Sequence, residues 1–323
     1  MPTERYPKIA IRSKNDLAKR IAYKTFSQSE ALDLINNVLN NFDSYWKDAP
    51  PPLSEPEKGK HVRNAKRTPL GKLLKLIDAR IFQPHDVTLP SFIFGGVRGK
   101  DHIKAAKSLI GQDKYRTELK LDLKRFFEHV PYERVLQFFV LKTGCSKKGG
   151  HLLARLCCVP IGKKGTKIEE MTIARGFATS SRLAIWCNLD FFIKLNWLVK
   201  KELKGYDPRV AIYVDDMGIT ASRVSRKQMK DLSIKIDHLF NPKDGTYCLP
   251  LNDKKTEILT YQQGMRILGT IIRRNKLSVS DKTSGKLYRL KRQIASSTDK
   301  KERNNLKKKR SQLLIYKRYV ENI

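Results

Sequence analysis

Two adjacent carboxylates in this sequence have the surroundings of a metal site. Asp215 and Asp216 follow the apolar run Val210-Ala-Ile-Tyr-Val, so the acidic pair lies at the end of a segment that is typical of a buried strand. Neighbouring carboxylates repel each other, and a divalent cation relieves that repulsion. A solvated β-turn would also contain aspartates, but it would not require the apolar strand. The pattern therefore favours metal binding.

A third carboxylate, Asp122, ends another strand-like segment. Glu118-Leu-Lys-Leu-Asp-Leu alternates polar and apolar residues, which predicts a strand with one buried face. Three carboxylates on neighbouring strands can hold two Mg²⁺ ions about 3.5–4 Å apart, with Mn²⁺ as a substitute. One ion would activate a 3′-hydroxyl and the other would bind a triphosphate. This spacing fits nucleotidyl transfer better than hydrolysis by one acid and one base.

The charge of the chain points to a polyanionic partner. Lys and Arg number 66 against 32 Asp and Glu, a net charge of +34 over 323 residues. Such a density repels itself unless nucleic acid neutralises it, which argues against an enzyme of small metabolites. Apolar residues make up 40% of the chain and are spread through it, which excludes disorder of the whole chain.

Cysteine, histidine and apolar patterns exclude several other classes. The five cysteines form no C-x-x-C pair and the six histidines have no zinc-ligand spacing, so reduced thiols and no zinc are expected. Residues 1–10 lack the apolar core of a secretion signal. No stretch approaches the roughly 18–20 apolar residues of a membrane span. We therefore expect a soluble cytoplasmic protein without membrane contact.

The hydrophobic pattern predicts an α+β protein. Residues 1–49 are expected to be helical, and Pro50-Pro51-Pro52 marks a boundary. After the first strand, the pattern predicts helices over 132–141, 176–203 and 227–240, a hairpin over 210–220 with its turn at Asp215-Asp216, and a strand over 266–272. This order suits an antiparallel palm-like sheet backed by helices.

The C-terminal region is strongly basic. Between Lys282 and Arg318 there are 14 Lys or Arg and only two acids. Sparse apolar stripes predict two helices, whose charge is either a solvated face or a surface that binds phosphates. The net charge favours phosphate binding, and four consecutive cations are its strongest candidates: Lys307, Lys308, Lys309 and Arg310.

Five motifs together resemble those of bacterial reverse transcriptases of the retron, group II intron and defence-associated kinds. In chain order they are Leu121-Asp122-Leu-Lys-Arg-Phe-Phe, Gly176-Phe-Ala-Thr-Ser, Tyr213-Val-Asp-Asp, Leu251-Asn-Asp-Lys-Lys-Thr and Ile267-Leu-Gly. The resemblance covers about residues 60–275 and implies a right-hand polymerase fold. It divides the chain into a helical extension (1–56), fingers and palm (57–275) and a basic helical thumb (276–323).

The resemblance also implies residue roles. Asp122, Asp215 and Asp216, with the backbone at Leu123, would hold the metals, and Lys255 would protonate leaving pyrophosphate. Phe127 matches the position that excludes a ribose 2′-hydroxyl, and Gly176 matches a glycine close to the nucleotide. The remaining candidates for the nucleotide are Leu123 and five cations: Arg63, Arg67, Arg98, Lys100 and Arg175.

The chain departs from the family pattern in the second motif. Family members commonly have Gln-Gly-x-Pro-x-Ser-Pro there, whereas this chain has Arg175, Ala178 and Ser181 in place of the Gln and both Pro. The leading hypothesis is an RNA-directed DNA polymerase that serves antiviral defence with a non-coding RNA, takes dNTPs and makes DNA. Template-independent or protein-primed synthesis, or RNA binding by a relic fold, are the alternatives. An effector partner or self-association stays open.

Overall fold

The structure is a computed structural model that describes residues 6–113, 115–242, 247–273 and 276–322. It divides into two compact units: the first comprises residues up to Gly99 with Lys124–Phe192, and the second comprises Lys100–Leu123 with residues from Ile193 on. These boundaries do not coincide with the predicted ones after residues 56 and 275, so the three-part division stays a prediction. The chain is a mixed α+β protein with small antiparallel sheets, as expected.

The first unit begins with short helices rather than one long helical segment. Ser13 caps α1 (Lys14–Ile21), and Ser27 and Glu30 form a capping box at the start of α2 (Gln28–Asn40). A tight turn between them joins Tyr23 and Phe26 by two backbone hydrogen bonds of 2.8 Å. The expectation of helix over 1–49 is therefore correct for α1 and α2, and wrong for residues 6–12, which are not helical, and for the turn; residues 1–5 lie outside the described residues.

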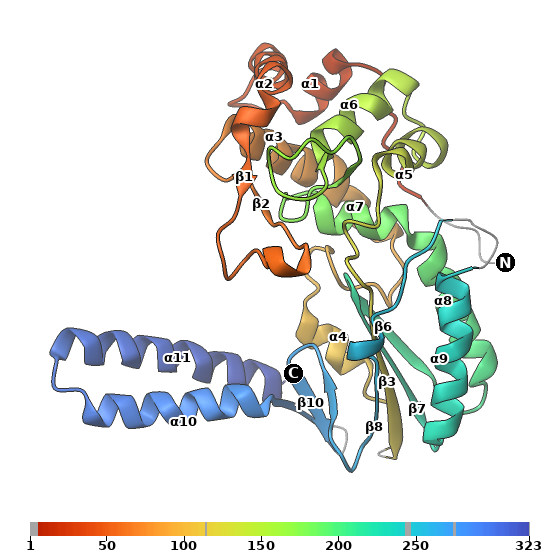
Figure 1. Ribbon diagram of the computed structural model, residues 1–323, viewed down its shortest axis with the longest axis vertical. Coiled ribbons are helices and arrows are strands. Elements are labelled where there is room, and N and C mark those ends of the chain that lie inside the picture. The colour runs from red at the N-terminus through yellow and green to blue at the C-terminus, as the bar shows by residue number, and fades with distance from the viewer. Residues whose placement is uncertain (1–5, 114, 243–246, 274–275, 323) are drawn as a thin grey trace. The chain divides into compact units, whose positions relative to one another are not determined.

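Helices dominate the rest of the first unit (Figure 1). Its core includes a cluster of rings in which Trp186 contacts Phe82 and Phe138 at centroid distances of 5.6 and 6.0 Å. The elements are η1 (Phe42–Tyr45), β1 (Lys47–Asp48), η2 (Pro56–Lys58), β2 (Arg63–Asn64), α3 (Pro69–Ile77), η3 (Asp78–Phe82), η4 (Gln83–Thr88), α5 (Tyr132–Gln137), η5 (Phe138–Lys142), α6 (Lys147–Cys157), β4 (Cys158–Pro160), β5 (Met171–Ile173) and α7 (Ser180–Cys187).

The long helix predicted over 176–203 is interrupted. Residues 176–179 precede α7, and α8 (Leu189–Glu202) starts after Asn188. The buried amide of Asn188 donates a 2.9 Å hydrogen bond to the Ala184 carbonyl, so it satisfies a terminal acceptor of α7. A polar residue in an apolar run therefore ends the helix here. The unit boundary falls within α8.

The second unit is built on a four-stranded antiparallel sheet (Figure 1). Its strand order is β6-β7-β3-β8, formed by β6 (Arg209–Tyr213), β7 (Asp216–Ser222), β3 (Arg116–Asp122) and β8 (Glu257–Thr260). The predicted strand at Asp122 and the predicted hairpin are confirmed. Helix α9 (Arg226–Phe240) packs on β3 and β8, and α4 (His102–Ser108) packs on β6.

Alternation along β3 gives this sheet two different faces. Leu119 and Leu121 lie on the apolar face. The other face carries Glu118, Lys120 and Asp122, and Gly218 pairs with Lys120 on it. A side chain at Gly218 would collide with Ile267 and Leu109, so this polar face is covered too. The expectation of a single buried face is therefore wrong, because both faces of β3 are buried.

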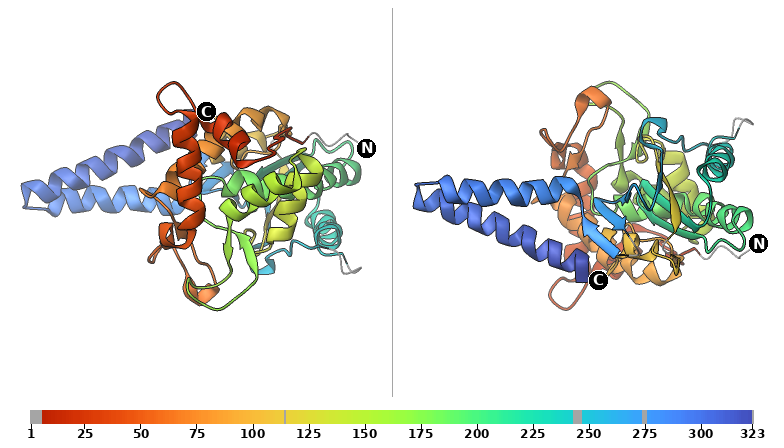
Figure 2. Two further views of the ribbon diagram at one scale, coloured as in Figure 1. Left: turned by 90° about the horizontal axis from the view of Figure 1, so that it is seen from above. Right: turned by 90° about the horizontal axis from the view of Figure 1, so that it is seen from below.

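A second small sheet and a helical hairpin complete this unit. The strand predicted over 266–272 is instead a hairpin, because Leu268 and Gly269 form a turn with φ of +51° and +78° between β9 (Met265–Ile267) and β10 (Thr270–Arg273). After β11 (Lys276–Val279), α10 (Asp281–Ser296) and α11 (Lys300–Asn322) run side by side as the two predicted basic helices (Figures 1 and 2). Within the described residues, no helix has an apolar stretch long enough to cross a membrane.

Candidate active site

The acidic pair lies at the tip of the β6–β7 hairpin in the second unit. Tyr213 pairs with Asp216, so the two turn residues are Val214 and Asp215, one position earlier than predicted. Val214 has a φ of +61°, an unusual value for a β-branched residue at a position where glycine is usual. Strained backbone of this kind persists only where the surrounding structure fixes it. As a result, Asp215 belongs to the turn, whereas Asp216 is the first residue of β7.

The third carboxylate lies directly beside this tip. Asp122, the last residue of β3, is the register partner of Asp216, the first residue of β7. One residue further on, the Leu123 N–H donates a 2.9 Å hydrogen bond to the Asp215 carbonyl oxygen. Directly opposed residues in an antiparallel pair project from the same face. The predicted carboxylates Asp122, Asp215 and Asp216 are therefore brought to one end of one sheet, with Leu123 at their side.

Burial and repulsion between the carboxylates both disfavour the ionised form of Asp216. Burial, then the charges of Asp215 and Asp122, raise the pKa of Asp216 to about 6. A nearby cation would stabilise the ionised form of such a carboxyl group, and carboxylate oxygens are the donors that Mg²⁺ prefers. The donor set thus fits a divalent cation. Among the described residues no group of three acids, histidines or cysteines is arranged as a ready-made metal cage.

Both oxygens of the Asp122 carboxylate already have donors. Lys255 Nζ lies 2.7 Å from Oδ1, and Asn252 Nδ2 lies 3.1 Å from Oδ2. Burial lowers the pKa of Lys255, but the hydrogen bond and charge of Asp122, with Asp216 and Asp215 beyond it, outweigh burial and leave that pKa above its ordinary value. The predicted catalytic lysine is therefore a cation at neutral pH, and it contacts one of the three carboxylates, Asp122.

In the first unit, the predicted gate residue lies under an arginine. The guanidinium of Arg175 lies 4.8 Å from the centroid of the Phe127 ring. It also forms a two-pronged ion pair with Glu128, through bonds of 3.0 and 2.9 Å. Burial raises the pKa of Glu128, but the hydrogen bond and the charge of Arg175 together lower it by more. The pKa of Glu128 is therefore below its ordinary value, and the pair is ionised. Arg175 thus covers the Phe127 ring while it is held in place by Glu128, the next residue in the chain.

Arg63 and Gly176 meet at the same place in the first unit. The Arg63 N–H donates a 2.6 Å bond to the Arg175 carbonyl. Gly176 has a φ of +100°, and a Cβ there would lie 2.6 Å from the Arg63 carbonyl oxygen. The Arg63 side chain is only 4% exposed and bonds Asp48 and the carbonyls of Pro160 and Gly162. These bonds favour a structural role for Arg63 over contact with a triphosphate.

The other predicted cations are placed more loosely. Arg67 and Arg98 are exposed on loops of the first unit, and the Arg98 N–H donates to Asp86. Lys100 belongs to the second unit, just before α4. On α11, Lys307, Lys308 and Lys309 are exposed and Arg310 is half-buried. Their predicted contacts with nucleotide or nucleic acid stay predictions.

Two residues of these clusters were missed by the sequence reasoning. Asn252 bonds Asp122, and Glu128 pairs with Arg175. Signals for both existed, because Asn252 stands three residues before Lys255 within the same motif and Glu128 directly follows Phe127. Each is a polar residue within three positions of a predicted site residue, but the side chain that it contacts is distant in sequence.

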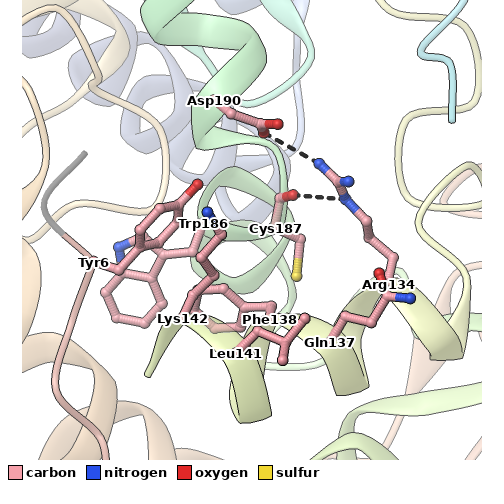
Figure 3. Close-up of a pocket in the computed structure, with 9 residues that line it drawn as sticks. All are labelled: Tyr6, Arg134, Gln137, Phe138, Leu141, Lys142, Trp186, Cys187 and Asp190. Carbon is pink, nitrogen blue, oxygen red and sulfur yellow. Dashed lines mark hydrogen bonds and ion pairs between the residues drawn. The ribbon is translucent and has the colours of Figure 1, made fainter. Parts of the chain in front are cut away.

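A separate pocket in the first unit does not compete with the carboxylates as a functional site. Its wall includes Trp186, Phe138 and the Arg134–Asp190 ion pair, and Arg134 also donates to the Cys187 carbonyl (Figure 3). Its volume is about 90 Å³, well below the roughly 300–1,000 Å³ of sites for small molecules. The pocket has room for a few water molecules, and no predicted site residue lines it.

The arrangement in the second unit therefore combines three carboxylates, a lysine that is protonated at neutral pH and a strand register that holds them together. Chemically, it can bind divalent cations and supply a proton. No protein-family model matches this chain, and no curated protein matches it.

Proposed function

We propose that this protein is an RNA-directed DNA polymerase that extends a 3′-hydroxyl with dNTPs. The observation that carries the proposal is the register that opposes Asp122 to Asp216 at the tip of the β6–β7 hairpin. It brings together two motifs that are 94 positions apart in the sequence. The net charge of +34 supports a nucleic-acid substrate.

The candidate site residues of the second unit each have a role in this proposal. Asp122, Asp215 and Asp216 would hold two Mg²⁺ ions, which when bound lower the pKa of the attacking hydroxyl and stabilise negative charge on the leaving pyrophosphate. Lys255 would donate a proton to pyrophosphate, a role that its protonated state at neutral pH supports. The exposed lysines of α11 would neutralise phosphates of a duplex.

Primer extension by the purified chain tests this proposal. We expect dNTP incorporation on an RNA template with Mg²⁺ or Mn²⁺, and none in EDTA. Equal incorporation without any template would instead favour template-independent synthesis, which the Arg175–Glu128 pair at the altered second motif makes the leading alternative. Binding of RNA without incorporation under any condition would identify a relic fold.

Replacing Phe127 with alanine is expected to admit ribonucleotides. The smaller side chain leaves room for the 2′-hydroxyl, so the ratio of kcat/KM for dNTP over rNTP should fall by a decade or more, about 1.4 kcal/mol per decade. Phe127→Tyr keeps the ring beneath Arg175 and should retain discrimination. An unchanged ratio in Phe127→Ala would mean that the ring only packs against Arg175.

Replacing Lys307, Lys308, Lys309 and Arg310 with alanine is expected to weaken duplex binding without changing chemistry. Each lost phosphate contact should reduce the slope of log K against log[salt] by about 0.9 on duplex DNA, and affinity should fall about equally for all sequences. Filter binding across a salt series measures the slope. Single-nucleotide addition at saturating duplex should survive, because the carboxylates are untouched, while product length falls.

A charge-matched control separates this local effect from net charge. Four exposed lysines on α8 and α9 serve that purpose: Lys194, Lys200, Lys227 and Lys230. Their replacement removes the same charge and should leave the salt slope closer to that of the unmodified chain. If both sets reduce the slope equally, α11 has no special role. Loss of affinity for one RNA sequence alone would instead indicate specific recognition.

A further inference from the structure

The partner of Asp122 raises a question about how a metal ion reaches it. The Asp122 side chain is 6% exposed, whereas that of Lys255 is 50% exposed. A buried carboxylate without a partner is strongly destabilised. In this structure its charge is balanced by the ammonium of Lys255, 2.7 Å from Oδ1, and its second oxygen accepts from Asn252.

Lys255 balances more than one carboxylate. Its charge acts on Asp216 as well as Asp122, and it opposes the repulsion that Asp215 and Asp122 impose on Asp216. Lys120, on the same face of β3, adds a second positive charge. Without a bound divalent cation, the cluster is therefore held by cations that belong to the chain itself.

The position of Lys255 allows it to leave. It ends the short helix η6 (Asp253–Lys255), and half of its side-chain surface is already in solvent. Asn252, by contrast, is anchored through its backbone, since its N–H donates a 2.8 Å bond to the Asp122 carbonyl. The ammonium is thus the exchangeable partner of Asp122 and the amide is the fixed one.

We propose that Lys255 is an internal counter-ion that occupies the Asp122 carboxylate until a divalent cation displaces it. The inference rests on the proposed function, because it takes Asp122 as a metal ligand. An ammonium and a divalent cation compete for the same carboxylate charge. Metal entry would therefore release the lysine toward solvent, so that only the metal-loaded site offers a free proton donor to a bound triphosphate.

Metal binding without nucleic acid tests this competition. We expect Lys255→Gln to bind Mn²⁺ on the order of tenfold more tightly than the unmodified chain in a calorimetric titration, because no competing charge remains. Lys255→Arg keeps the charge and should keep an affinity near that of the unmodified chain. Lys254→Gln removes an exposed neighbouring charge from η6 and is the matched control. In EDTA, Lys255→Gln should have the lowest Tm of the three variants, and Mn²⁺ should narrow that gap.

Chemical labelling tests the displacement itself. An amine-acylating reagent followed by mass spectrometry should modify Lys255 slowly in EDTA and faster with Mn²⁺, whereas Lys254, in the same peptide, should show no such change. Equal labelling of Lys255 with and without Mn²⁺, or an unchanged Mn²⁺ affinity in Lys255→Gln, would overturn the inference.

Asp122→Asn separates this inference from the proposed function. If Asp122→Asn abolishes Mn²⁺ binding while Lys255→Gln leaves the affinity unchanged, the metal site stands and only the counter-ion role fails. If Asp122→Asn leaves Mn²⁺ binding intact, Asp122 is not a ligand, and the proposed function and the inference fail together.

Discussion

Asp215→Asn is expected to abolish the proposed DNA synthesis and to leave the fold intact. The carboxylate is expected to act on charge that develops in the transition state, so kcat should fall by at least roughly a thousandfold. The hydrogen bond that fixes the turn uses the Asp215 backbone carbonyl, which the substitution preserves. Asparagine is also accepted in tight turns. Primer extension gives the rate, and duplex affinity should stay within about twofold of the unmodified chain.

Asp253→Asn is the matched control for this variant. Asp253 is an exposed aspartate of the same unit, in the helix η6 that ends at Lys255. It should retain full activity. The Tm of Asp215→Asn in EDTA should be no lower than that of the unmodified chain, because a repelling charge has been removed. Synthesis by Asp215→Asn above a few per cent of normal would exclude the proposed site.

Glu118→Gln is expected to stabilise the protein, and more so as pH rises. Glu118 lies on the polar face of β3, is fully buried, and neither carboxyl oxygen makes a well-formed hydrogen bond to a described residue. Burial raises its pKa from 4.5 to about 8, against smaller opposing effects of the Lys120 charge and the Arg266 N–H. The folded protein therefore keeps a proton that the unfolded chain releases.

The sign of the pH dependence follows from that proton. Between about pH 4.5 and pH 8, each rise of one pH unit lowers the free energy of unfolding by roughly 1.4 kcal/mol through Glu118. Outside this window Glu118 contributes no further change with pH. Glutamine cannot ionise, so the gain in free energy of unfolding should be near zero at pH 4.5 and should reach a few kcal/mol at pH 8. Urea unfolding at several pH values measures the difference between the two proteins.

Glu257→Gln is the control for Glu118→Gln. Glu257 lies on β8, opposite Lys120 of β3 in the strand register, but unlike Glu118 it is exposed. It should leave the pH dependence of unfolding nearly unchanged. Parallel curves for Glu118→Gln and the unmodified chain would mean that Glu118 reaches solvent or a partner in solution. Glu118→Met, which removes all hydrogen-bonding capacity, should also be stabilising at pH 8 if burial is the cause.

Local patterns were sufficient to identify the elements that carry the carboxylates. Alternation from Glu118 to Leu123 identified β3, and the apolar run before Asp215 identified the hairpin, because a strand has a period of two that is legible within a few residues. The carboxylates could likewise be nominated from residue type and motif. Capping residues such as Ser27 and Glu30 were also legible, although the prediction of a single helical segment did not use them.

What each polar side chain contacts was decided only by the tertiary structure. Lys255 and Asp122 are 133 positions apart, and Arg175 and Glu128 are 47 apart, so no local pattern relates them. Similarly, a strand pattern cannot reveal that Ile267 of β9 and Leu109 cover the polar face of β3, on which Glu118 is buried. The turn at Val214 depends on strand register, which hydrogen bonds along the whole hairpin fix. Sequence determined which groups this protein has at its strand ends, and long-range packing determined which of them are paired, buried or exposed.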